Sequence, residues 1–138
     1  MIRLVLAAIA GAAVGLNREL QQKPAGLRTH ALVALGAALL AIVALLLRPG
    51  DGASAARIIQ GIVSGIGFIG AGVILHRDDT KGVHGLTTAA AVWTVAAVGI
   101  VIGLGLWRAA IATLGIVLVI LAGGEYVDRW LHQRFVRR

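Results

Sequence analysis

The chain has 138 residues, of which 59% are hydrophobic and only 14% are charged, and its mean hydropathy is +0.91. Soluble domains carry about a quarter charged residues, so this composition excludes an ordinary soluble domain. The chain has no cysteine, which excludes disulfides, thiolate metal sites and cysteine nucleophiles.

The charged residues are clumped and leave five uncharged stretches, which are Leu4–Asn17, Thr29–Leu47, Ile58–Leu75, Gly82–Trp107 and Ala109–Gly124. A helix needs about 20 apolar residues to cross a bilayer. Three stretches reach that length, and the shorter ones at the ends have flanking Arg and Lys that can snorkel. The sequence therefore predicts an all-α integral membrane protein, a bundle of five transmembrane helices. The connections are Asn17–Arg28, Arg48–Arg57, His76–Gly85 and Gly103–Arg108.

The first stretch has an alternative interpretation as a signal peptide. The segment "MIRLVLAAIAGAA" offers one Arg, a short apolar core and an Ala8-Ile9-Ala10 cleavage pattern. However, the apolar run continues through Leu16, and a single Arg makes a thin basic region before it. We therefore favour a spanning helix.

Basic residues are unevenly divided between the two sides of the predicted bundle. The first and third connections and the C-terminal tail carry nine Lys and Arg, and the other side carries four. The positive-inside rule makes the richer side cytoplasmic, with the N-terminus outside and the C-terminus inside. If Leu4–Asn17 does not span, the N-terminus moves to the cytoplasm and the rest stays in place. We divide the chain into a transmembrane domain, residues 1–124, and a basic cytoplasmic tail, residues 125–138.

The net charge of +7 would suggest a nucleic-acid partner for a soluble protein. Basic residues that flank membrane segments and face anionic headgroups explain it better here. We expect the lipid bilayer, and not nucleic acid, as the partner of these charges.

The segment "GIGFIGAG", Gly65 to Gly72, contains the G-x-G-x-x-G spacing of a dinucleotide-binding turn. That fingerprint must follow a strand and meet an acidic residue about 20 positions later. Here it lies inside an apolar run with no such carboxylate, so the nucleotide interpretation fails. Small residues let helices approach closely in lipid, and a broken helix around Gly67–Gly72 is the alternative. We expect helix packing, within the chain or in a dimer, at Gly61, Gly65, Gly67, Gly70, Ala71, Gly72, Gly99 and Gly103.

Ionisable groups are nearly absent from the middle of the stretches, which argues against a proton pump or a carboxylate-lined cation path. The polar residues within them should make interhelical or i−4 hydrogen bonds rather than contact a substrate; they include Ser64, Thr87, Thr88 and Thr94. No serine lies in a G-x-S-x-G motif, and the four histidines show no i, i+4 pair. We expect no catalytic residue, no metal site and no cofactor.

The segment "NRELQQKPAGLRTH", Asn17 to His30, is the densest polar cluster on the predicted cytoplasmic face. An exposed ion pair of Glu19 would contribute under about 1 kcal/mol, whereas a buried pair would be a latch that is costly to break. Pro24 disfavours helix before it, and Gly26 permits a conformation that Ala would resist. The candidate functional motif is Asn17, Arg18, Glu19, Lys23, Pro24, Gly26, Arg28, Thr29 and His30.

Three segments, "GLNRELQQKPAGLRTHALVALGAAL", "GIGFIGAGVIL" and "GVHGLTTAAAVWTVAAVGI", resemble the MgtC/SapB family of bacterial inner-membrane proteins. The resemblance implies five crossings, a cytoplasmic C-terminus and a link to magnesium limitation and virulence. Many members add a soluble C-terminal domain, so we expect a short member or a transmembrane domain alone. The signature positions are Asn17, Arg18, Glu19, Pro24, Gly26, Leu27, Arg28, Thr29, Gly65, Gly67, Gly70, Ala71, Gly72, Gly85, Leu86, Thr87, Thr88, Ala89 and Ala90.

Two functions follow from these observations. The first is a regulatory or interaction protein linked to magnesium homeostasis or envelope stress, which would bind copies of itself or other membrane proteins. The second is a small transporter or channel for Mg²⁺ or another cation. Mg²⁺ favours oxygen ligands, and the acidic residues of the inner connections, Glu19, Asp78 and Asp79, all lie outside the deep part of the membrane.

Overall fold

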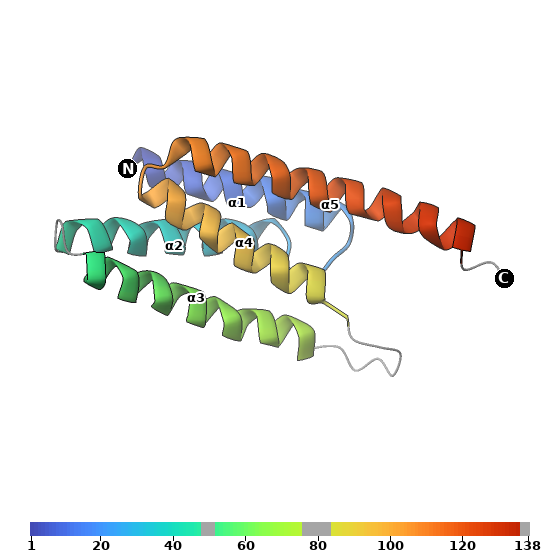
Figure 1. Cartoon of the computed structure of the whole chain (residues 1–138), viewed down its shortest axis with the longest axis horizontal. Coiled ribbons are helices and arrows are strands. Elements are labelled where there is room, and N and C mark those ends of the chain that lie inside the picture. The colour runs from blue at the N-terminus through green and yellow to red at the C-terminus, as the bar shows by residue number, and fades with distance from the viewer. Residues whose placement is uncertain (48–51, 76–83, 136–138) are drawn as a thin grey trace.

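The computed structural model describes residues 1–47, 52–75 and 84–135, and these residues form a bundle of five α-helices (Figure 1). No strand occurs within these ranges, which confirms the predicted all-α class. The helices are α1 (Ile2–Leu20), α2 (Leu27–Leu47), α3 (Gly52–Leu75), α4 (Leu86–Gly103) and α5 (Trp107–Phe135).

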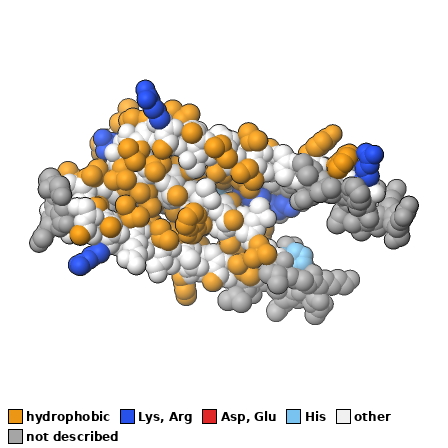
Figure 2. All heavy atoms as spheres, viewed as in Figure 1, with side chains coloured by type: hydrophobic (Ala, Val, Ile, Leu, Met, Phe, Trp, Pro, Cys, Tyr) orange, Lys and Arg blue, Asp and Glu red, His pale blue; other side chains and the backbone are white. Residues whose placement is uncertain are grey.

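Four helices, α2 to α5, are long and apolar enough to cross a membrane. This confirms a helical membrane protein. The remaining helix, α1, lies against α2 and α4 in the same bundle but carries Arg3, Arg18 and Glu19 within its 19 residues. A crossing by α1 is still a prediction. Hydrophobic side chains cover much of the visible face of the bundle (Figure 2).

The central helix is α4, which contacts each of the other four helices. Small side chains fill the space between α1, α2 and α4 and leave almost no exposed surface. These residues include Ala7, Val14, Ala34, Ala38, Val95 and Val98. Because alanine and valine are short, the three helix backbones can approach one another closely.

Glycines make the closest of these approaches. A Cβ added at Gly99 would meet the backbone of Ala34, and one added at Gly103 would lie 2.6 Å from the carbonyl oxygen of Ala38. A Cβ added at Gly11 of α1 would likewise meet the carbonyl oxygen of His30 on α2. Even one methyl group at these positions would push α4 or α1 away from α2.

The glycines of α3 have different surroundings. A Cβ added at Gly61, Gly65, Gly67 or Gly72 would meet nothing within 4 Å, and one at Gly70 would meet only Ala89. Gly70 is buried and faces Ala89 of α4. The other four glycines make no close helix contact within the described chain, where Ala71 is also exposed. Packing of these residues against a second copy is still a prediction.

The course of α3 also corrects two expectations. It is unbroken through Gly67–Gly72, so the alternative of a broken helix there is wrong. It also begins at Gly52, within the connection expected at Arg48–Arg57. Alanines 53, 55 and 56 explain the early start, since alanine is the strongest helix former.

Other helix ends differ from the apolar stretches for a similar reason. Arg, Glu and Gln are good helix formers in water, and α1 continues through Glu19 to Leu20. Helix α5 likewise continues past Gly124, so the predicted tail is helical as far as Phe135. Within the connection at His76–Gly85, residues 76–83 lie outside the described residues, and these include Asp78 and Asp79.

Candidate functional site

The candidate motif folds as the end of α1, a short turn and the start of α2. Asn17, Arg18 and Glu19 are helical, and Pro24 lies in the turn, as expected. The backbone N–H of Lys23 donates to the carbonyl oxygen of Arg18 at 3.0 Å, which closes the end of α1. Arg28, Thr29 and His30 form the first turn of α2.

The sequence singled out Gly26 for its backbone conformation, and that reason is wrong. The residues of this turn with positive φ are Gln22 and Ala25, at 54° and 58°, whereas Gly26 has an ordinary φ. Space rather than conformation favours glycine here, because a Cβ at Gly26 would lie 2.7 Å from Oε2 of Glu19 and the carboxylate would have to move. On its other side, a Cβ added at Gly15 would lie 2.7 Å from the carbonyl oxygen of Gly26.

Glu19 caps the second helix. Its Oε2 accepts a hydrogen bond of 2.8 Å from the backbone N–H of Leu27, the first residue of α2. The first N–H groups of a helix lack partners within it, and the positive end of the helix dipole favours a carboxylate. Sequence spacing did not reveal this role, because a helix cap is normally sought within three residues of the N–H groups it accepts, and Glu19 lies eight residues before Leu27.

Arg18 is the buried charge of the site, with only 3% of its surface exposed. Its Nη2 donates a hydrogen bond of 2.8 Å to Oγ1 of Thr88 on α4, which is itself 2% exposed. Its Nη1 lies 3.5 Å from Oε1 of Gln21. A buried guanidinium is costly unless its N–H groups find acceptors, so these contacts fix the end of α1 against α4.

Gln21 extends the connection to a third helix. Its Nε2 lies 3.5 Å from the carbonyl oxygen of Leu121 in the middle of α5. We did not single out Gln21 from the sequence, where it is one of two adjacent glutamines in a polar run. Only the position of α5 distinguishes it.

His30 is fully buried. Its Nδ1 lies 3.0 Å from the carbonyl oxygen of Gly26. Because a carbonyl can only accept, Nδ1 carries the proton and Nε2 of the neutral ring is an acceptor. Within the described part of the chain, neither this Nε2 nor the buried Oδ1 of Asn17 has a hydrogen-bond donor. Both atoms can accept from water or from a hydroxyl group, so the motif contains two unused acceptors.

The motif thus has a buried layer and an exposed layer. Arg18 and His30 lie inside the bundle, whereas Lys23, Pro24 and Arg28 are exposed and Thr29 is half-buried. The structure does not bring the other predicted polar residues to this site except Thr88: Ser64 and Thr87 are exposed. Thr94 donates to the carbonyl oxygen of Ala90 at 2.8 Å, the i−4 bond expected of it. Among the described side chains, no group of three or more His, Asp and Glu could hold a metal ion.

Comparison with known proteins places this site in a family. The chain matches the model of the MgtC family over residues 4–130. It is 44% identical to Protein SrpB of Synechococcus elongatus, over 98% of this chain and 81% of that protein. No solved structure matches it.

Two further relatives are longer than this chain. It is 44% identical to the "Putative magnesium transporter YhiD" of Escherichia coli, over 88% of this chain and 58% of that protein. It is 43% identical to Protein MgtC of Salmonella typhimurium, over 86% of this chain and 49% of that protein. The chain therefore spans about half the length of these two relatives. The family match over residues 4–130 reaches all five helices and contains the whole candidate motif, and the chain belongs to the MgtC family.

Proposed function

We propose that this protein is a non-catalytic regulatory or interaction protein of the bacterial inner membrane, linked to magnesium homeostasis or envelope stress. The observation that carries the proposal is the bracing of the candidate motif. Arg18 connects it to α4 and Gln21 connects it to α5, so the turn between α1 and α2 is held on three helices. The exposed Lys23, Pro24 and Arg28 then form a fixed surface that a partner can contact.

The packing inside the bundle favours a partner that contacts the exposed Lys23, Pro24 and Arg28 over transport of an ion through a single chain. Alanine and valine side chains pack between α1, α2 and α4, and Gly99 and Gly103 lie against the backbone of α2. Mg²⁺ prefers oxygen ligands, carboxylates above all. Glu19 has the only carboxylate among the side chains that the structure describes, and it is exposed and caps α2.

The alternative is a small transporter or channel for Mg²⁺ or another cation, and the printed name of YhiD favours it. Since the described bundle is filled along α4, such a path would form between copies of the chain. The exposed glycines of α3, for example Gly67 and Gly72, are the surface on which a second copy would pack. We propose a homodimer on this face, and the double variant Gly67→Leu and Gly72→Leu tests it. A lower mass in detergent supports the dimer, and an unchanged mass in a folded protein contradicts it.

Photo-crosslinking in native membranes tests the regulatory proposal. A photoreactive amino acid replaces Lys23 on the exposed turn, and a matched variant carries it at Leu106, exposed in the turn at the other end of the bundle. We expect the Lys23 position to capture another membrane protein, identified by mass spectrometry, that the Leu106 position does not capture.

A flux assay tests the alternative. The purified protein is reconstituted into vesicles that contain a Mg²⁺ indicator. Saturable Mg²⁺ uptake that is lost in Glu19→Gln, with the fold retained, would reverse the order of the two proposals.

A further inference from the structure

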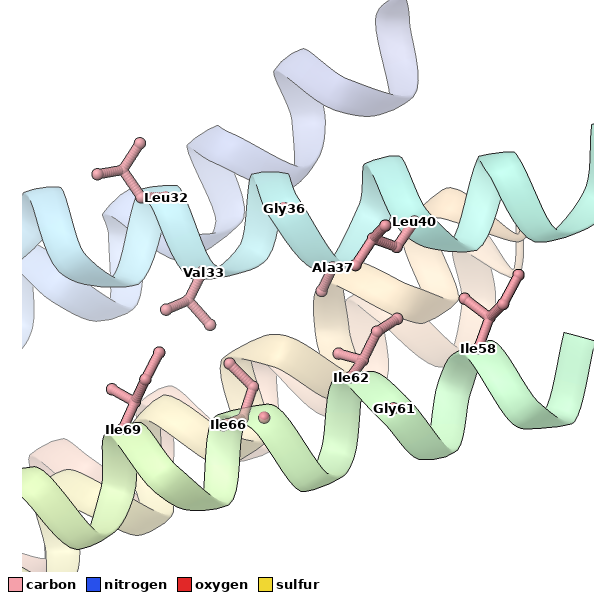
Figure 3. Close-up of a pocket in the computed structure, with 11 residues that line it drawn as sticks. Leu32, Val33, Gly36, Ala37, Leu40, Ile58, Gly61, Ile62, Ile66 and Ile69 are labelled. Carbon is pink, nitrogen blue, oxygen red and sulfur yellow. The ribbon is translucent and has the colours of Figure 1, made fainter.

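A groove runs between α2 and α3 on the side of the bundle away from α5. It has a volume of about 520 Å³. Figure 3 shows Ile58, Ile62 and Ile66 of α3 pointing toward α2 across it, with Val33 pointing back from α2. All its lining residues are aliphatic or glycine. It lies within the apolar spans of both helices, so lipid is the solvent beside it.

Glycines keep the groove open. A Cβ added at Gly36 on one wall, or at Gly61 or Gly65 on the other, would meet nothing within 4 Å. The groove also has the size of a ligand site, since pockets for small molecules measure about 300 to 1,000 Å³. These glycines therefore provide room for a ligand rather than contact between α2 and α3.

The guanidinium of Arg57 lies on the same face of α3 as the groove. Residues four apart share a face of a helix, and Arg57 precedes Gly61, Gly65 and Ile69 at that spacing. Arg57 is exposed and lies five residues after Gly52, about 8 Å along α3 from its first residue. A cation within a spanning segment is costly unless it pairs with an anion or reaches the headgroups.

The direction of the side chain fits such an anion. Long side chains on a helix point back toward its N-terminus, so we expect Arg57 to extend toward the membrane surface at which α3 begins. A guanidinium binds phosphate oxygens with two parallel hydrogen bonds. Arg57 is not a lining residue, but it directly precedes the lining residue Ile58, so a group that can bind phosphate lies next to the aliphatic groove.

We propose that this groove binds one anionic phospholipid, with an acyl chain between its two glycine-containing walls and the phosphate on Arg57. An apolar chain linked to an anion matches both parts of the site, whereas an apolar helix of a partner or a second copy would itself bring no anion to Arg57. The site lies on α2 and α3, apart from the surface of Lys23, Pro24 and Arg28. It can therefore be tested independently of the proposed regulatory function.

The experiment uses the full chain in mild detergent with equal amounts of phosphatidylglycerol and phosphatidylcholine, and native mass spectrometry counts the bound lipids. Arg57→Gln removes the charge, and Arg108→Gln is its control, because Arg108 is an exposed arginine at the start of α5 away from the groove. Gly61→Leu fills the groove, with Gly115→Leu as control, since Gly115 is an equally open glycine, on α5 and outside the lining. Gly36→Leu fills the groove from α2, in case Gly61→Leu does not fold.

We expect wild type and both controls to retain phosphatidylglycerol about fivefold more than phosphatidylcholine, the ratio for one basic residue at an anionic headgroup. Arg57→Gln should remove this preference, and the groove-filling variants should lose both lipids. Equal retention of the two lipids by wild type, or an unchanged preference in Arg57→Gln, would overturn the proposal. A groove-filling variant that lowers the oligomer mass without changing lipid binding would assign the groove to a second copy instead.

Discussion

Arg18 of α1 and Thr88 of α4, 70 positions apart in the chain, share a hydrogen bond of 2.8 Å between Nη2 and Oγ1, and both side chains are buried. The bond joins the candidate motif to the helix that contacts every other helix of the bundle. A disturbance of the motif therefore reaches the core directly, and the following predictions depend on this connection and on the close helix contacts.

Thr88→Val should destabilise the protein because the guanidinium of Arg18 would lose its acceptor on α4. Hydrogen bonds to charged groups contribute about 1.5 to 3 kcal/mol, so we expect the free energy of unfolding in detergent to fall by about 2 kcal/mol. Thr87→Val is the matched control, since Thr87 is the exposed neighbour, and its effect should stay within about 0.5 kcal/mol. Equal effects of the two variants would show that the bond is not important for stability.

Gly99→Ala should separate α4 from α2, because the added Cβ would meet the backbone of Ala34. Overpacking typically costs about 1 to 3 kcal/mol, and a backbone atom cannot rotate away as a side chain can. Gly115→Ala on α5 is the control, where the added methyl group would meet nothing within 4 Å. Thermal unfolding in the same detergent measures both. A melting temperature of Gly99→Ala at or above that of Gly115→Ala would contradict the close approach.

Glu19→Ala should weaken the start of α2, since the N–H of Leu27 would lose its carboxylate acceptor. Loss of a helix cap costs about 0.5 to 2 kcal/mol. Gly26→Ala should act through the same contact, because its Cβ would displace Oε2 of Glu19. The double variant should therefore lose less stability than the sum of the two single variants. If the losses of stability add strictly in denaturant titrations, the two residues do not act through a shared contact.

The absence of cysteine permits a test of membrane orientation with single cysteine variants. We expect Lys23→Cys to be protected from a membrane-impermeant maleimide in intact bacteria, because its turn lies on the predicted cytoplasmic side. Leu106→Cys, in the opposite turn, should be labelled. Ile2→Cys decides whether α1 crosses: labelling supports five crossings, and protection leaves four. Labelling of Lys23→Cys together with protection of Leu106→Cys would invert the orientation.

The apolar stretches were sufficient to predict the helices. A spanning segment must satisfy its backbone hydrogen bonds internally, so length and hydropathy fix helix number without knowledge of the packing. The pattern of small residues was less decisive. The same reasoning applied to Gly99 and to Gly61, yet the former lies against Ala34 and the latter borders an open groove. Glycine permits a close approach, but only the arrangement of the helices supplies the neighbour.

The candidate motif shows the same division. The sequence determined by itself that polar residues gather between Asn17 and His30, because a chain so rich in apolar residues has few places for charge. The tertiary structure alone decided the role of each residue. Arg18 is buried and bonded to Thr88, Glu19 accepts from the N–H of Leu27, and Gly26 leaves room for the carboxylate of Glu19. Local spacing cannot reveal such roles, since each depends on atoms that a turn or another helix brings within 3 Å.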